Sequence, residues 1–272
     1  MSPEVSERSF EGAIEDTLLL GGPNAQAQRT AAVHESPPPY GEYIPGGYLK
    51  RLREDYDRSL RLIPRDVIDF ILATQPKEWQ RLKEHHGAEV RERFLKRLSL
   101  EIERRGALDV LRNGVKDSGC KFRLAYFRPA SGLNEELQRL HAANLFAAVR
   151  QLHYSEKDKS LDLGLFLNGI PIFTAELKNP LSGQTVEEAI KQYQATRDPR
   201  EPLFAYGRCL AHFAVDPDLV YVTTHLMGPN TRFLPFNQGK FGGAGNPRHS
   251  SHAIGIRHGL PVGKDVGEGQ RS

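Results

Sequence analysis

The sequence predicts an α/β domain preceded by a mostly helical N-terminal section. Three observations lead to this prediction. Apolar residues recur at helical spacing in the first part of the chain, short apolar runs of strand length dominate after Gly119, and two further helical segments separate those runs. The 272 residues are 39% hydrophobic and 26% charged, which is close to the globular average, so a buried core is expected.

The N-terminal section, residues 1–118, is expected to be helical. Four helices are predicted from the spacing of apolar residues: 7–20, 64–74, 76–86 and 88–105. The first of them carries Glu11 and Glu15 beside its apolar side. Residues 24–48 are rich in proline and glycine, which sustain neither a helix nor a central strand, so we expect a loop there.

The second section, residues 119–241, is expected to form the α/β core. Six short apolar or alternating runs predict strands: 122–127, 145–154, 161–167, 170–177, 209–215 and 219–226. Two helices are predicted among them, over residues 134–143 and 185–196, and the second opens with a capping-box pattern. Gly, His, Ser and Pro then dominate residues 242–272, where we expect a disordered or non-native tail.

Composition excludes several classes of protein. No apolar run approaches the roughly 20 residues that a membrane-spanning helix needs, and the N-terminus lacks the layout of a secretory signal. Cys120 and Cys209 are too few for a disulfide framework or a closed zinc site, so we expect reduced thiols in a cytoplasmic protein. A net charge of +3 is only mildly basic and does not by itself indicate nucleic-acid binding.

Acidic residues stand on two apolar strands that meet at Asn168-Gly169, a dipeptide typical of hairpins. Asp162 lies on the first strand, and Glu176 and Lys178 share a face of the second. If these groups converge, the two carboxylates could hold Mg²⁺, which prefers hard oxygen ligands. Without convergence they are ordinary solvated charges at the edge of a sheet.

The turn between the strands decides whether the carboxylates converge. A two-residue turn would pair Leu167 with Ile170 and put the carboxylates on opposite faces. A bulged turn, with Gly169 in the left-handed conformation, would shift the pairing by one residue. Asp162 would then face Thr174 and lie diagonal to the glutamate. We predict the bulged turn, because it places both carboxylates and the lysine on one face.

These residues also carry a resemblance to a known family. Asp162 followed by Glu176-Leu-Lys178 resembles the PD-(D/E)xK nuclease pattern. A longer set of segments resembles the N-terminal nuclease domain of the restriction (R) subunit of type I restriction-modification systems: 161–171, 176–184, 213–216, 221–224 and 231–239. The short pattern is weak alone, whereas the extended one is specific, and the resemblance runs from about residue 10 to residue 247.

The resemblance implies a restriction-endonuclease-like mixed sheet flanked by helices and the activity of a type I site-specific deoxyribonuclease. By this resemblance, Asp162 and Glu176 would bind Mg²⁺ and Lys178 would be the catalytic lysine. Gln192 matches the catalytic glutamine of a Q-x-x-x-Y pattern, but Thr196 stands where the tyrosine is expected. An acidic residue of the first helix often completes the site.

Either Glu11 or Glu15 could supply that acidic group, and we favour Glu15 as a third metal ligand. Lys191 and Arg197 are expected to contact the DNA backbone, because phosphate binding uses Lys and Arg without reading bases. The alternative hypothesis is a catalytically inactive module with a nuclease fold that only binds DNA or docks other subunits.

The partners implied by the resemblance are double-stranded DNA and the methylation and specificity subunits of a restriction complex. The full R subunit also carries an ATP-dependent translocase, whose phosphate loop would read G-x-x-x-x-G-K-[ST]. No such loop occurs in the 272 residues. We therefore expect a fragment that keeps the nuclease domain, with ATP used only by a motor region absent from this chain.

Overall fold

The computed structural model describes residues 7–21, 47–130, 133–157, 159–180 and 183–236. Its helices are α1 (Glu7–Gly21), α3 (Pro64–Thr74), α4 (Pro76–His86), α5 (Val90–Arg105), α6 (Ala107–Asn113), α7 (Glu135–Ala142) and α8 (Val186–Ala195). Its strands are β1 (Leu49–Arg51), β2 (Val115–Asp117), β3 (Cys120–Phe122), β4 (Phe146–His153), β5 (Ser160–Leu167), β6 (Ile170–Leu177), β7 (Ala211–Val215), β8 (Val220–Thr223) and β9 (Leu234–Pro235). None of the helices within these ranges combines the length and the apolar character that crossing a membrane requires.

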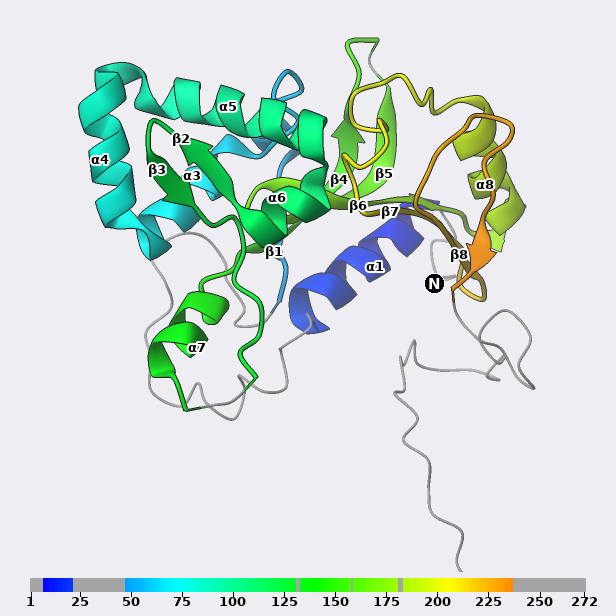
Figure 1. Ribbon diagram of the computed structural model, residues 1–272. Coiled ribbons are helices and arrows are strands. Elements are labelled where there is room, and N and C mark those ends of the chain that lie inside the picture. The colour runs from blue at the N-terminus through cyan, green and yellow to red at the C-terminus, as the bar shows by residue number, and fades with distance from the viewer. Residues whose placement is uncertain (1–6, 22–46, 131–132, 158, 181–182, 237–272) are drawn as a thin grey trace, which may run out of the picture.

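Seven strands form one mixed sheet, in the order β1-β4-β5-β6-β7-β8-β9 (Figure 1). The pairs β1/β4 and β6/β7 are parallel, and the other neighbours are antiparallel. The parallel pair β6/β7 is connected through α8, since parallel neighbours need a crossover segment. The predicted mixed sheet flanked by helices is confirmed.

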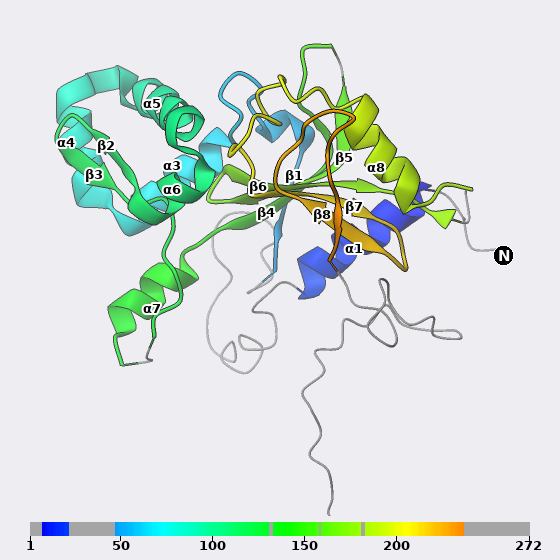
Figure 2. The same cartoon turned by 45° about the vertical axis from the view of Figure 1, so that its right-hand side comes forward.

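Helices α1 and α8 cover opposite faces of this sheet. The apolar side of α1 packs on Leu163 and Leu177, next to Phe213 of β7. Helix α8 packs on Ala214, the neighbour of Phe213 along β7. Because successive strand residues point to opposite faces, these contacts place the two helices on the two sides of the sheet, as Figure 2 also shows.

A helical lobe formed by α3 to α6 stands beside the sheet and encloses the β2–β3 hairpin (Figures 1 and 2). Its core includes Trp79, Phe94 and Phe122, whose rings meet edge to face, with the Phe94 and Phe122 centroids 4.8 Å apart. Ile170 and Ile172 of β6 belong to the same core, so the lobe packs against the hairpin end of the sheet.

Most predicted elements are confirmed, and the differences have physical causes. The helices predicted over 64–74 and 76–86 have those limits, each beginning at a proline. The strand predicted over 122–127 is wrong beyond Phe122, because β3 pairs only with the short β2. Four of these helices and strands that the sequence did not reveal, α6, β1, β2 and β9, are short.

Two predicted segments fall on residues that the structure does not describe. The loop at 24–48 lies outside the described residues apart from positions 47 and 48, and the tail at 242–272 lies wholly outside them. The division of the chain at residue 118 stays a prediction. From the first section, β1 nevertheless joins the sheet that the later strands form, and α1 packs on that sheet.

The predicted bulged turn is wrong. Leu167 pairs with Ile170 around a two-residue turn, in which Asn168 and Gly169 have φ values of 51° and 78°. The Asn168 side chain is buried and holds this turn: its Nδ2 donates to the Leu124 carbonyl at 2.8 Å, and its Oδ1 accepts from the Leu145 amide at 2.7 Å. These tertiary bonds are invisible in the local sequence.

A bulge inside the hairpin then restores the register on which the site depends. Phe166 pairs with Pro171, whereas the next residue, Leu165, pairs with Phe173, so β6 carries one extra residue. Proline has no N–H to give to a ladder and is found in sheets at bulges and edges, so Pro171 accounts for the bulge. Beyond it, Leu163 pairs with Ala175, the last pair of the β5/β6 ladder. Continuing this register by one residue would place Asp162 opposite Glu176 rather than opposite Thr174.

Candidate active site

Asp162 and Glu176 lie on adjacent strands at the point where the β5/β6 ladder ends. The Asp162 carboxylate is tied to the second strand, because its Oδ2 accepts a hydrogen bond from the backbone N–H of Leu177 at 2.7 Å. Its Oδ1 accepts a longer bond, 3.4 Å, from the side chain of Gln151 in β4. Backbone and side chain together fix the aspartate beside the glutamate, and Asp162 is only half-buried.

Glu176 has an unusual environment. Its side chain is completely buried, and its Oε1 accepts a 2.6 Å charge-assisted bond from Nε of Arg197. Its other oxygen, Oε2, is buried without a hydrogen-bond partner among the described residues. A buried carboxylate oxygen without a hydrogen-bond partner lowers the stability of a folded protein unless another group binds to it.

Electrostatics agree with this geometry. Burial, the largest cause, and the neighbouring charge of Asp162 together raise the pKa of Glu176 to about 8. The charges of Arg197 and Lys178 act in the opposite direction but do not compensate. The pair of carboxylates therefore lacks positive charge, which a cation could provide.

Lys178 follows directly after β6 and is buried. Its backbone N–H donates to the carbonyl of Val215 at 2.8 Å, which continues the parallel pairing of β6 with β7 past the end of the strand. Since alternate strand residues share a face, this extension keeps Lys178 on the side of Glu176. The positive charge of Lys178 acts to lower the pKa of Glu176, although less than the other causes do.

The burial of Arg197 argues against its predicted role as a DNA-backbone contact. Its side chain is only 7% exposed and is engaged by Glu176 and by the hydroxyl of Tyr154, to which Nη1 donates at 3.2 Å. Lys191 is exposed, as a DNA contact requires, and it forms a surface ion pair with Glu188 at 3.1 Å. Such a pair is weak enough to exchange for a phosphate.

Helix α8 faces the site through Tyr193 rather than through Gln192. The Tyr193 hydroxyl lies 2.8 Å from Thr174 Oγ1, which is also 2.7 Å from Nδ1 of His212. These three buried side chains form a polar network beside Glu176 on the α8 face of the sheet, and burial lowers the pKa of His212 to about 4, which keeps the imidazole neutral. Gln192 is half-buried on the same helix, and its catalytic role stays a prediction.

Of the two glutamates of α1, the structure links Glu11 rather than Glu15 to the aspartate. Nε2 of Gln151 donates to Glu11 Oε1 at 3.1 Å and to Asp162 Oδ1 at 3.4 Å. Gln151 has a positive φ of 48°, which turns its side chain out of the regular alternation of β4. No local pattern in the sequence signals this conformation, so the bridge could not be predicted.

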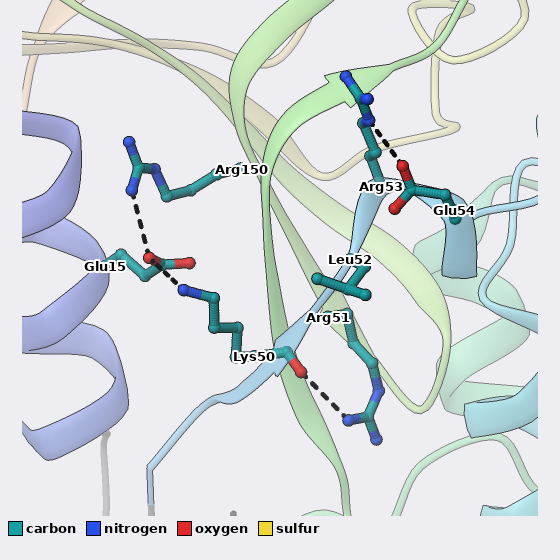
Figure 3. Close-up of a pocket in the computed structure, with 7 residues that line it drawn as sticks. All are labelled: Glu15, Lys50, Arg51, Leu52, Arg53, Glu54 and Arg150. Atoms are coloured by element: carbon teal, nitrogen blue, oxygen red, sulfur yellow. Dashed lines mark hydrogen bonds and ion pairs between the residues drawn. The ribbon is translucent and has the colours of Figure 1, made fainter. Parts of the chain in front are cut away.

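Glu15 lies instead at a separate pocket of about 230 Å³ between α1, β1 and β4 (Figure 3). The pocket is lined by Glu15, Lys50, Arg51, Leu52, Arg53, Glu54 and Arg150. Lys50 and Arg150 reach Glu15 from the two strands at 3.0 and 3.4 Å. Both cations already neutralise Glu15, which argues against a direct role for it as a metal ligand.

The donor set fits a hard divalent cation with two protein carboxylates. Among the described residues no group of three or more His, Cys, Asp or Glu side chains could hold a metal ion. Mg²⁺ commonly keeps several waters and uses only one or two carboxylates, so a third acidic ligand is not required. Asp162 and the orphaned Oε2 of Glu176 are the oxygens that could hold it.

Comparison with known proteins points to one family. The sequence matches the family described as type I restriction enzyme R protein N terminus over residues 71–231. The match spans more than half of the chain, from the end of α3 to the segment after β8, and includes every strand of the candidate site. No curated protein and no solved structure gives a match.

Proposed function

The chain belongs to the type I restriction enzyme R protein N-terminal family, and from this premise we propose that it is a Mg²⁺-dependent endonuclease domain that hydrolyses phosphodiester bonds of double-stranded DNA. The observation that carries the proposal is Oε2 of Glu176, which is buried without a hydrogen-bond partner among the described residues, next to Leu177, whose backbone N–H holds Asp162. Two carboxylates with too little positive charge around them are suited to bind a divalent cation.

In this proposal Asp162 and Glu176 hold Mg²⁺, which when bound acts as a Lewis acid towards the phosphoryl oxygens. Lys178 orients the attacking water and offsets the negative charge that develops on the phosphate. The water oxygen forms a new bond to phosphorus and loses a proton to solvent, the bond from phosphorus to one sugar oxygen breaks, and the departing sugar oxygen takes up a proton from solvent. Gln192 remains a candidate for positioning the reacting groups.

We also propose the binding partners and the cellular location of the chain from its family. Double-stranded DNA is the substrate, and the methylation and specificity subunits of a restriction complex supply the choice of sequence. Lys191 is the remaining proposed contact to the DNA backbone. ATP is used in this proposal by a motor region that does not belong to these 272 residues, and the domain acts in the cytoplasm.

The proposal is tested by incubating supercoiled plasmid with the protein and Mg²⁺ and following nicked and linear DNA on gels. We expect nicking that EDTA abolishes and that Asp162→Asn and Lys178→Met both remove. Glu92→Gln and Lys96→Met are matched controls, because these two exposed side chains of α5 pair only with each other among the described residues. Both controls should nick as the unsubstituted protein does.

One observation favours the second candidate, an inactive module with a nuclease fold. Arg197 already takes one oxygen of Glu176, and a buried salt bridge can simply replace a lost metal. DNA binding without Mg²⁺-dependent nicking, or nicking that survives both site substitutions, would support that module and contradict the endonuclease.

A further inference from the structure

We propose that Arg197 is a positioning residue that fixes the Glu176 carboxylate so that Oε2 alone is presented to a divalent cation. The inference rests on the proposed function, because it concerns the same site, and it assigns to Arg197 a role different from contact with DNA. Arg197 would touch neither the substrate nor the cation. It would act through the glutamate.

The division of labour between the two glutamate oxygens is the first step of the argument. Oε1 is taken by Nε of Arg197 at 2.6 Å, whereas Oε2 has no hydrogen-bond partner among the described residues although it is equally buried. A terminal carboxylate torsion is broad and nearly two-fold, so an unrestrained glutamate would expose either oxygen. One short bond to a fixed guanidinium removes this freedom.

Arg197 is itself held by the backbone of Gln192 and by the side chain of Tyr154. Its backbone N–H donates to the Gln192 carbonyl at 3.2 Å, directly after the end of α8. Its Nη1 donates to the Tyr154 hydroxyl at 3.2 Å, and the guanidinium lies 5.6 Å from the centroid of the Tyr154 ring. Tyr154 packs in turn against Phe204, with centroids 4.7 Å apart. A side chain fixed in this way can orient its partner.

The contact between Arg197 and Glu176 allows a second interpretation. The two interpretations predict opposite effects on cation binding when Arg197 is removed. If Arg197 orients the glutamate, its removal weakens cation binding, as the loss of groups behind metal ligands typically does by 10–100-fold. If Arg197 instead competes with the cation for the glutamate, its removal eliminates a repulsive charge and strengthens binding. The fork geometry of arginine, which lysine lacks, favours orientation.

The test measures Mn²⁺ binding by electron paramagnetic resonance, with the free protein and Mn²⁺ as the only ligand. We expect Arg197→Ala to bind Mn²⁺ about 10–100-fold more weakly than the unsubstituted protein. Arg197→Lys, which keeps the charge but not the fork, should fall between them. Arg200→Ala is the matched control, since Arg200 is 90% exposed and pairs only with Asp198 among the described residues.

The outcomes separate this inference from the proposed function. Mn²⁺ binding that depends on Glu176 but is equal or tighter in Arg197→Ala overturns the positioning role alone. No binding by the unsubstituted protein, or equal binding by Glu176→Gln, overturns both. If Arg197→Ala does not fold, as judged by circular dichroism, Arg197→Lys decides: an affinity within about twofold of the unsubstituted protein contradicts the role of the fork.

Discussion

Two buried glutamates, one in each half of the molecule, are satisfied very differently. Glu101 on α5 is 5% exposed, and three arginines of the same helix surround its carboxylate: Arg97 at 3.0 Å, Arg104 at 2.9 Å and Arg105 at 3.1 Å. Glu176 in the sheet is fully buried, has one arginine and keeps one oxygen without a hydrogen-bond partner among the described residues.

The difference shows in the direction of the two pKa shifts. Hydrogen bonds from Arg104 and Arg105 lower the pKa of Glu101, so its charge stabilises the helical lobe. Burial raises the pKa of Glu176, so its charge destabilises the sheet unless a cation is present. A buried glutamate that is paired with arginines of its own helix stabilises the fold. A buried glutamate with too little positive charge around it indicates a binding site.

The largest effect is expected on plasmid nicking, which should depend on Glu176 and not on Glu101. Glu176→Gln should lower Mg²⁺-dependent plasmid nicking by more than about 100-fold, because the amide cannot replace a charged metal ligand. The Gln Oε1 still accepts from Arg197, so at pH 6, below the raised pKa of Glu176, the thermal unfolding midpoint should change little. Initial nicking rates and circular dichroism melts measure both. If Glu101→Gln lowered nicking as much, the comparison would fail.

The second prediction concerns the hairpin that brings Glu176 to Asp162. Asn168→Ala removes buried hydrogen bonds and leaves a non-glycine residue at φ 51°, so the free energy of unfolding should fall by about 2–4 kcal/mol. Urea unfolding measures this change. Asn113→Ala, which loses one bond to Asp109 at the surface, is the control and should cost less than about 1 kcal/mol. Equal losses would mean that the turn does not depend on Asn168.

The third prediction concerns the pH dependence of stability that follows from the raised pKa of Glu176. Since the folded protein holds the Glu176 proton above the pH at which the unfolded chain releases it, its contribution to stability is present below about pH 4.5 and is lost as the pH rises through about 8. Without metal, the unfolding midpoint should therefore fall more steeply between pH 6 and pH 8 in the unsubstituted protein than in Glu176→Gln. Mg²⁺ should raise the midpoint more at pH 8 than at pH 6. Parallel curves for the two proteins would contradict the raised pKa.

The smallest effect is expected for Glu101, whose carboxylate is paired with three arginines. Glu101→Gln weakens ion pairs to arginines that are themselves 25–70% exposed, and such pairs contribute little. The free energy of unfolding should fall by about 0.5–1 kcal/mol, measured in urea, with nicking unchanged. A loss above about 3 kcal/mol would place Glu101 among strictly buried ion pairs.

The sequence predicted the mixed α/β fold and most of its elements, because apolar periodicity and prolines report directly on helices and strands. It did not reveal β1 or β9, which have three and two residues and are defined only by their neighbours in the sheet. The turn prediction failed for a similar reason. Hydrogen bonds from Asn168 to distant backbone select the two-residue turn, and only the fold brings those groups together.

The candidate site was predictable in part. The sequence pattern predicts Asp162, Glu176 and Lys178 as site residues, and Pro171 is a local signal for the bulge in the hairpin. The roles of Gln151 and Arg197 depend on side chains that meet across the sheet. Arginine near an active site in sequence suggests contact with phosphate, yet burial decides whether it can reach DNA.

The most direct test of the central claim, that Asp162 and Glu176 together bind a divalent cation, is a crystal of the protein soaked in Mn²⁺ and measured at an anomalous wavelength. The account predicts one anomalous peak within about 2.0–2.3 Å of Glu176 Oε2 and close to an oxygen of Asp162, with Arg197 still on Oε1. A peak elsewhere, or none at these carboxylates under saturating Mn²⁺, would contradict it.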